Sequence, residues 1–379
     1  MKIVLIGPVY PYKGGIAHYT SLMYRALCKK HDVTLISYRM QYPKILFKKA
    51  QKDYSNDLFK VDDVQFIMNT ANLFNIIGVA RRINKVKPDM VIMQWWHPYF
   101  APCYRILCGS LNRQIKKIFI CHNVFPHERF PMDRFLTKMT LKKGDGFIVH
   151  SKSDGKDLES IDENLVYREN PHPTYNAFKI ANLSKKEARG QLGIDADKKL
   201  LLFFGFVREY KGLKYLLNAM PALKEQYGNG IKLLVVGSFD GDKDNYMKIV
   251  EDNNINDVVD VIDGYIPDNE VEKYFAACDL VVLPYETATQ SGIVQIAYGF
   301  EKPVIVTNVG GLPDVVEDGV TGYVVEPKNE KTLAKRISDY YMPNVADCMK
   351  KSVKECAYRF DWDRIVEKIE ELRSDCIEG

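Results

Sequence analysis

The chain has 379 residues, 46% hydrophobic and 27% charged, a composition typical of soluble globular proteins and long enough to predict two domains. The opening residues predict no signal peptide, because Gly7, Pro8 and Pro11 interrupt a short apolar run. The sequence contains no run of 18 apolar residues, so it predicts no membrane span. The eight cysteines are scattered without a C-x-x-C pair, so we expect free thiols, a cytoplasmic location and no zinc site.

The net charge of +4 hides an asymmetry between the two halves. Residues 1–170 contain 27 Lys and Arg against 15 Asp and Glu, whereas residues 171–379 contain 26 against 34. The basic pairs of the first half are Lys48-Lys49, Arg81-Arg82, Lys116-Lys117 and Lys142-Lys143. They form either a solvated basic face or a surface attracted to an anionic membrane or an anionic acceptor. No nucleic-acid-binding motif accompanies them, so nucleic acid is not an expected partner.

Short apolar runs alternate with helical patterns along the whole chain. In the first half the predicted strands are 2–7, 32–38, 64–68, 90–94, 117–122 and 146–151. In the second half they are 199–206, 231–237, 257–265, 279–285, 302–308 and 322–326. Runs rich in β-branched residues without polar alternation predict parallel strands covered by helices on both faces, so we expect an α/β protein with two doubly wound domains.

The boundary between these domains is predicted at the proline-containing segment NPHPTYN, which gives domains at 1–172 and 173–358. An amphipathic helix follows at the C-terminus, and Asp361 is its expected N-cap. In open α/β sheets, ligands bind beyond the carboxyl ends of the strands. The loops that follow strands are therefore the candidate sites.

Three such loops stand out in the first half. Gly14-Gly15 precedes a helix expected near Ile16, which is either a phosphate-binding turn or a plain connection. His122 directly follows a buried strand, where it can donate to a substrate oxygen. Cys121 precedes it but should point to the opposite face, which argues against a Cys–His nucleophile. The loop QWWHPYFAP offers aromatic rings that either stack on sugar or lipid at a cleft or pack beneath the domain.

Two loops stand out in the second half. Arg208 and Lys211 lie in one strand-to-helix turn, a pair that suits a diphosphate or forms a surface pair at a helix start. Further on, Ser291 to Ile293 precede a helix, where a hydroxyl and backbone N–H groups can meet an anion. Glu286, at the end of the strand before them, either accepts hydrogen bonds from sugar hydroxyls or is an exposed loop acid. The Asp-x-Asp patterns indicate turns and caps, so no metal site is expected.

The order of these segments resembles the retaining group 1 glycosyltransferases of GT-B fold. The segments that carry the resemblance are FFGFVREYKGLKYLL, AACDLVVLPYE, SGIVQIAYGFEKPVIVTNVGGLPDVVEDGVTGYVV and the final FDWDRIVEKIEEL. The resemblance implies two Rossmann-like domains facing a central cleft, with the donor nucleotide held mainly by the second. It also implies that the C-terminal helix, 359–379, packs back on the first domain.

The resemblance also assigns residues. It implies that Arg208 and Lys211 hold the donor diphosphate and that His122 lies close to the transferred sugar. The implied donor contacts are Gly14, Gly15, Tyr265 (at the base), Glu286, Ser291, Gly292 and Ile293. Two positions depart from the family pattern. The arginine is three rather than five residues before the lysine, and the usual second glutamate is missing, with Gln295 the nearest polar side chain.

The implied reaction is transfer of a sugar from a nucleoside diphosphate sugar to a hydroxyl, with retention and without metal or cofactor. The acceptor would be a glycan or a lipid-linked molecule at the cytoplasmic membrane face. Its candidate contacts are Trp95, Trp96, His97, His127 and Glu128. Two alternatives stay open: a sugar-nucleotide epimerase of similar fold, and a binding subunit that has lost catalysis. The sequence leaves the donor base and sugar undetermined.

Overall fold

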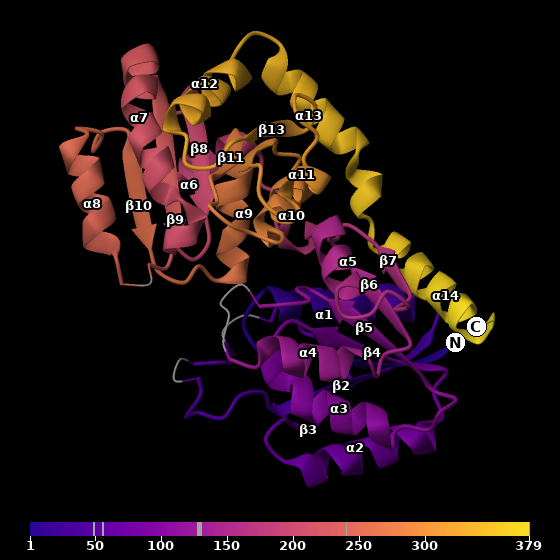
Figure 1. Ribbon diagram of the computed structural model, residues 1–379. Coiled ribbons are helices and arrows are strands. Elements are labelled where there is room, and N and C mark those ends of the chain that lie inside the picture. Colours follow the sequence, from indigo (N-terminus) through magenta and orange to yellow (C-terminus); the bar gives the residue numbers. More distant parts are fainter. Residues whose placement is uncertain (48–49, 55–56, 127–130, 240, 379) are drawn as a thin grey trace. The chain divides into compact units, whose positions relative to one another are not determined.

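The computed structural model describes residues 1–47, 50–54, 57–126, 131–239 and 241–378 (Figure 1). The chain divides into a first domain, Met1–Pro171 with Asp361–Gly379, and a second domain, His172–Phe360. The boundary predicted from the sequence, between 172 and 173, differs from this division by one residue. The C-terminal segment belongs to the first domain, as the resemblance implied.

The first domain is built on a seven-stranded sheet in the described part of the chain, with strand order β3-β2-β1-β4-β5-β6-β7. Every strand pair in it is parallel. The strands are β1 Lys2–Ile6, β2 Asp32–Met40, β3 Gln65–Asn69, β4 Met90–Trp95, β5 Lys116–Cys121, β6 Gly146–Val149 and β7 Tyr167–Glu169. The inner strands are buried on both faces, as their continuous apolar sequences predict.

Helices cover both faces of this sheet. They are α1 Gly15–Cys28, α2 Leu73–Val86, α3 Ala101–Ser110, α4 Asp133–Leu141, α5 Lys152–Glu159 and α14 Trp362–Glu378. Helices α1 and α14 share one core with the sheet, and α14 contributes Ile365, Val366, Ile369 and Leu372 to it. Helices α2 and α3 pack on the opposite face. The Asp361 carboxylate accepts a hydrogen bond from the N–H of Asp363 at 3.1 Å, which fits its expected role at the start of α14.

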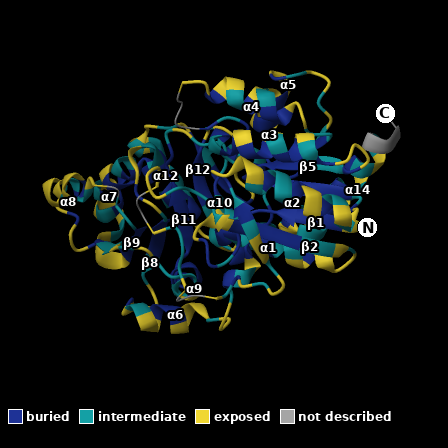
Figure 2. Cartoon of the chain, turned by 90° about the horizontal axis from the view of Figure 1, so that it is seen from below, coloured by how far each residue is buried: buried dark blue, intermediate teal, exposed yellow. Residues whose placement is uncertain are grey.

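The second domain has a parallel sheet with the order β10-β9-β8-β11-β12-β13 among the described residues. Its strands are β8 Lys199–Phe204, β9 Ile231–Gly237, β10 Val259–Asp263, β11 Leu280–Leu283, β12 Val304–Thr307 and β13 Gly322–Val325. Its helices are α6 Lys185–Leu192, α7 Leu213–Tyr227, α8 Lys243–Asp252, α9 Asp268–Ala277, α10 Gly292–Gly299, α11 Leu312–Val315, α12 Glu330–Tyr340 and α13 Val345–Glu355. Figure 2 shows the inner strands of both sheets as buried and the outer turns of the helices as exposed.

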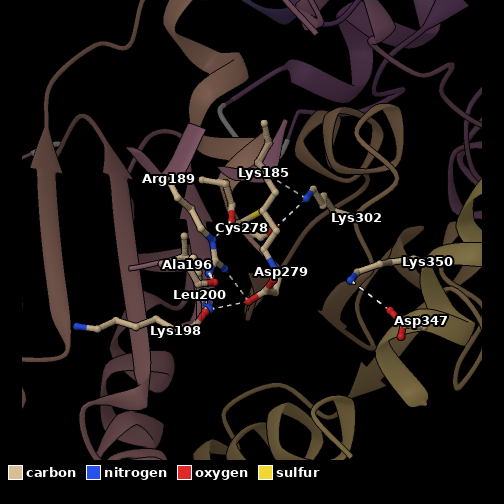
Figure 3. Close-up of polar contacts among 12 residues, drawn as sticks. Lys185, Arg189, Ala196, Lys198, Leu200, Cys278, Asp279, Lys302, Asp347 and Lys350 are labelled. Atoms are coloured by element: carbon tan, nitrogen blue, oxygen red, sulfur yellow. Dashed lines mark hydrogen bonds and ion pairs between the residues drawn. The ribbon is translucent and has the colours of Figure 1, made fainter. Parts of the chain in front are cut away.

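A buried charge network closes the amino-end edge of the second sheet (Figure 3). Asp279, just before β11, pairs with Lys185 at 2.5 Å and with the fully buried Arg189 at 3.1 Å. It also accepts a hydrogen bond from the N–H of Leu200 at 2.8 Å. Burial alone would raise the pKa of Asp279, but these hydrogen bonds and the nearby positive charges hold it below its ordinary value. Lys302 donates to two backbone carbonyls nearby, and burial lowers its pKa.

All twelve predicted strands are present, with ends that differ by a few residues. Strand β7 was missed, because its three residues are Tyr, Arg and Glu and carry no apolar run. Within the described ranges, no helix combines the length and the apolar character needed to cross a membrane.

Candidate functional site

The second sheet has its topological switch point between β8 and β11. The chain leaves β8 toward β9 on one side, while β11 lies on the other, so the loops after these two strands diverge at the place where open α/β sheets bind ligands. Arg208 and Lys211 follow β8, and residues 284–291 follow β11. The fold thus brings these sequence-predicted donor residues to neighbouring strand ends.

Lys211 is the residue at this switch point whose position is most informative. It ends a short 3-10 helix, η3 Glu209–Lys211, and its Nζ lies 5.3 Å from the centre of the Tyr285 ring. A Cβ placed on Gly205 would lie 3.3 Å from the Lys211 Nζ and 3.6 Å from the Cδ1 of Ile293. The ammonium group is therefore beside the first turn of α10. Among the described residues it has no carboxylate partner.

Two glycines hold the loop that follows β11. Gly212 has φ 65°, and a Cβ there would lie 2.0 Å from the carbonyl oxygen of Pro284. Gly310 has φ 53°, and its Cβ would lie 1.6 Å from the carbonyl oxygen of Ala288. No side chain fits at either position, and both conformations favour glycine. Residues 284–291 are consequently clamped between the turn after β8 and the turn after β12.

The clamped loop leads into α10, whose N-terminus lies at the same switch point. The Ser291 hydroxyl accepts a hydrogen bond from the N–H of Ile293 at 3.3 Å and lies 3.4 Å from the Tyr285 hydroxyl. The first turn of α10 contains no acidic residue. A helix start of this kind favours an anion through its backbone N–H groups and its dipole. A role of Ser291, Gly292 and Ile293 as phosphate contacts stays a prediction.

Glu286 has an environment that the sequence did not reveal. Its carboxylate pairs with Lys214 at 3.0 Å and Lys328 at 2.9 Å, and the Tyr215 hydroxyl donates to it at 3.0 Å. Burial raises its pKa, but the two lysines and the tyrosine outweigh burial and lower that pKa to about 2. The reading of Glu286 as an exposed loop acid is wrong, since its side chain is only 14% exposed. A contact to sugar hydroxyls stays a prediction.

The other two donor predictions differ in exposure. Tyr265 follows β10 after Gly264 and is 42% exposed, so it can meet a base. Gln295 is buried in α10, and its Oε1 has no hydrogen-bond partner among the described residues. The expected contact of Gln295 with a ribose stays a prediction.

In the first domain the switch point lies between β1 and β4, and His122 stands next to it, after β5. Its Nε2 lies 2.7 Å from the Oε1 of the buried Gln94, and its ring meets Tyr19 edge-on at 4.6 Å. This pair orients the imidazole at the carboxyl end of the sheet. The neighbouring His150 is buried, which lowers its pKa to about 4 and keeps it neutral at physiological pH. Gln94, Tyr19 and His150 were not singled out by the sequence.

Cys121, in contrast, lies in the core on the α3 side of the sheet. Burial raises its pKa well above the ordinary value, so it is not a thiolate. The expectation that Cys121 and His122 point to opposite faces is confirmed, because His122 packs against Tyr19 of α1.

The aromatic loop after β4 corrects the sequence analysis. Trp95 was a candidate acceptor contact, but it is fully buried, and its Nε1 donates to the carbonyl of Val124 at 3.2 Å. It ends β4 on the core-facing side of the strand, so the reading that it packs beneath the domain holds. Trp96 is half-buried and donates to the Tyr42 hydroxyl at 3.1 Å. His97 accepts a hydrogen bond from the N–H of Tyr99 at 3.0 Å.

The two remaining acceptor predictions, His127 and Glu128, lie outside the described residues. Gly14 and Gly15 lie where the sequence placed them, after β1. Helix α1 begins at Gly15, one residue before the expected Ile16, and no described side chain caps it. Gly14 has φ 106° with open space around it, so backbone is accessible there. The described residues contain no group of three metal-ligating side chains.

The comparisons with known proteins agree with this geometry. Residues 184–355 match the model of "Glycosyl transferases group 1", and residues 13–170 match that of "Glycosyltransferase Family 4". The chain is 24% identical over 397 residues to spore coat protein SA of Bacillus subtilis, covering 97% of this chain and 98% of that one. It is 31% identical over 198 residues to the uncharacterized glycosyltransferase MJ1607 of Methanocaldococcus jannaschii, covering 49% of this chain and 48% of that protein.

Among solved structures, Anabaena Alr3699/HepE in complex with UDP is similar over 99% of this chain and 100% of its own, with a TM-score of 0.74 and 17% identity. The same protein has been solved with UDP-glucose. Two Rossmann-like domains of this kind define the GT-B class of glycosyltransferases. The two matched models cover most of the chain, which belongs to the group 1 glycosyltransferases.

Proposed function

We propose that this glycosyltransferase moves a sugar from a nucleoside diphosphate sugar to a hydroxyl of a glycan or lipid-linked acceptor, with retention and without a metal. The observation that carries the proposal is the Lys211 ammonium beside the first turn of α10, with no carboxylate partner among the described residues. A cation and a helix start at one switch point suit a diphosphate. Complexes of HepE with UDP and UDP-glucose support a nucleotide-sugar donor.

In the proposed reaction the bond between the anomeric carbon and the diphosphate oxygen breaks, and the acceptor oxygen bonds to that carbon on the same face. The departing diphosphate takes the acceptor proton. Lys211, Arg208 and the N–H groups of α10 stabilise the negative charge that develops on the leaving group. This fixed positive field gives the charge stabilisation for which other enzymes use a metal ion. His122, held in place by the buried Gln94, would orient a sugar hydroxyl.

The direct test is a thermal-shift panel of nucleoside diphosphates and their sugars. A ligand at 100 times its dissociation constant adds about 2.7 kcal/mol to the free energy of unfolding. The stabilising sugar nucleotide is then incubated with the enzyme and a lipid-linked or oligosaccharide acceptor, and the anomeric configuration of the product is read by NMR. An inverted product would contradict retention, and conversion of the donor without any acceptor would favour an epimerase.

A second candidate, a nucleotide-sugar-binding subunit without catalysis, has one observation in its favour. Glu286 is engaged by two lysines rather than open to a substrate, and Gln295 is buried. This candidate predicts donor stabilisation in the thermal-shift panel with neither transfer nor donor hydrolysis. Turnover with any acceptor rules it out.

We also propose that the enzyme works at the cytoplasmic membrane face as a peripheral protein. The support is the excess of Lys and Arg in residues 1–170, since anionic lipids attract such a surface. A lipid-linked acceptor would bring its hydroxyl to the same place. Fractionation of cells expressing the protein tests this location, because a peripheral protein leaves the membrane fraction at high salt.

A further inference from the structure

Helix α2 presents to solvent a face that is basic along its length and apolar at its N-terminal end. Phe74, Gly78, Arg81 and Lys85 recur at spacings of four, three and four, which places them on one side of the helix. Arg81, Arg82 and Lys85 are exposed, and Phe74 is 87% exposed. The fourteen residues of α2 contain no Asp or Glu.

A hollow of about 210 Å³ lies beside this face, between α2, the edge strand β3 and its neighbour β2. Arg39 and Arg82 line it from opposite elements, Phe66 and Gly78 line it as well, and a Cβ on Gly78 would meet open space. Neither arginine has an ion pair or hydrogen-bond partner in the part of the chain that the structure describes. Two arginines at one hollow suit a phosphate group, because guanidinium groups bind its oxygens in pairs.

The acidic residues closest in sequence to this face are engaged elsewhere. Asp89 accepts hydrogen bonds from Arg373 and from the N–H of Lys2. Asp62 and Asp63 act electrostatically on Tyr24 of α1, on the opposite face of the sheet. Within the described ranges, no carboxylate forms an ion pair with Arg39, Arg81, Arg82 or Lys85.

Apolar side chains continue from the N-terminus of α2 along the carboxyl-end edge of the sheet. Ile45 is 85% exposed and Leu46 63% exposed, in the loop after β2. Contacts link this loop to the start of α2: Phe47 stacks on Tyr42 at 5.7 Å, and Tyr42 packs on Tyr99 at 4.9 Å. The Tyr99 hydroxyl lies 2.8 Å from that of Thr70, just before α2. The apolar residues therefore belong to the end of the domain where His122 lies.

We infer that Arg39, Phe74, Arg81, Arg82 and Lys85 form a docking surface for an anionic phospholipid membrane, with one lipid phosphate in the hollow between Arg39 and Arg82 and Phe74 inserted among the acyl chains. Charge complementarity selects the occupant, since the surface pairs unpartnered cations with an exposed aromatic ring. Figure 1 shows α2 at the outside of the first domain beside α3. The inference rests on the proposed function, because docking at a membrane would bring the enzyme to a lipid-linked acceptor.

The test is co-sedimentation of the full chain with vesicles of phosphatidylcholine alone and of equal parts phosphatidylcholine and phosphatidylglycerol. The wild type should bind only the anionic vesicles and be released at high salt. Arg39→Gln with Arg82→Gln should weaken binding about fivefold for each arginine. Phe74→Ser should weaken it about tenfold. Wild-type binding by the double variant, or no binding by the wild type at low salt, overturns the inference.

Matched controls remove two positive charges or one exposed apolar side chain from the second domain. Lys331→Gln with Lys335→Gln takes two exposed charges from α12, and Met342→Ser takes one exposed apolar side chain, so both should bind as the wild type does. Displacement from the vesicles by inorganic phosphate at constant ionic strength would instead indicate a site for soluble phosphate. Equal binding of duplex DNA through the same arginines would likewise overturn the membrane assignment.

The experiment separates this inference from the proposed function. It contains no nucleotide sugar, so vesicle binding can succeed even where the chain binds no donor. Conversely, the Arg39, Arg82 and Phe74 variants should keep the wild-type thermal shift with the stabilising nucleotide sugar. A variant that loses both readouts has lost its fold, and circular dichroism with the unfolding midpoint identifies it.

Discussion

The two ends of the second sheet use charge in opposite ways. At the amino-end edge, Asp279 and Arg189 are buried and hydrogen-bonded to backbone and to each other (Figure 3). At the carboxyl-end edge, Arg208 is exposed and Lys211 has no carboxylate partner within the described ranges. A buried charge is tolerated only with its partners in place. A cation that lacks a carboxylate partner at a strand end is therefore a stronger sign of a ligand site than a buried ion pair is.

The comparison predicts that substitutions at the two ends of the sheet affect different properties of the protein. Substitution at the amino end should cost folding free energy and spare the chemistry of the protein that remains folded. Substitution at the carboxyl end should cost turnover and spare folding. The first domain repeats the contrast with two histidines, one at each end of its sheet.

The largest effect should come from Asp279→Ala, which leaves Arg189 buried with an uncompensated charge. Removing one partner of a buried pair costs about 3–5 kcal/mol of unfolding free energy. Urea unfolding of the variant measures this cost. The exposed pair of Lys350 and Asp347 is the control, because Asp347 is 89% exposed and Asp347→Ala should change stability by less than about 1 kcal/mol. Equal costs for the two variants would contradict the contrast.

Next in size is the loss of turnover in Lys211→Ala. Removing one preorganised donor to a developing charge typically costs about 3–4 kcal/mol of barrier, or 10²–10³ in kcat. Arg208→Ala should show a loss in the same direction, while the unfolding free energy of both variants stays near that of the wild type. Lys248→Ala, an exposed lysine on α8, is the matched control. Wild-type kcat/KM in Lys211→Ala would sink the donor-site assignment.

The second domain also shows how far sequence reasoning reaches. The strands and the residues after them were predicted, because continuous apolar runs and loop position are local properties. The partners of Glu286 were not, because Lys214 and Lys328 are distant in sequence and only the fold brings them together. For the same reason the sequence did not separate Asp279, which stabilises the fold, from the acids of loops and caps.

The first domain shows a second limit. Four aromatic residues in one loop cannot all face the same way, and composition does not say which of them are buried. Trp95 ends β4 and points into the core with Phe119, whereas Gln94, one residue earlier, points to the other face and meets His122. Alternation along the strand decides this, and it depends on where the strand ends. The predicted strand ended at residue 94, one residue too early.

A smaller loss is expected at the first sheet, from His122→Ala. Removing a hydrogen bond of about 1.5 kcal/mol to a sugar hydroxyl lowers transfer about tenfold. The thermal shift with a nucleoside diphosphate should be unchanged, because we propose that the second domain binds it. His31→Gln is the control, since His31 follows α1 at the amino end and its Nε2 lies 2.9 Å from a carboxylate oxygen of Glu370 in α14. Equal loss of transfer in both variants would mean that His122 acts only through stability.

The smallest effect is expected for Lys328→Ala, at the carboxyl-end edge of the second sheet. Lys328 is 60% exposed, so its ion pair with Glu286 should contribute only slightly to the free energy of unfolding at neutral pH. The pKa of Glu286 is about 2 in the folded protein, whereas the ordinary pKa of a glutamate is 4.5. The contribution is therefore complete above about pH 4.5 and is lost as the pH falls toward 2. Urea unfolding of wild type and variant across this range should converge at the acid end.

Lys331→Ala, a neighbouring exposed lysine, should differ from the wild type at no pH. A difference for Lys328→Ala that persists below pH 2 would contradict the pairing with Glu286. The same variants decide what Glu286 is for. If it only anchors the loop after β11, Glu286→Gln and Lys328→Ala should weaken donor binding to a similar, small extent. If it also meets the donor sugar, Glu286→Gln should lose far more, because a carboxylate that contacts substrate is not replaced by the lysine that holds it.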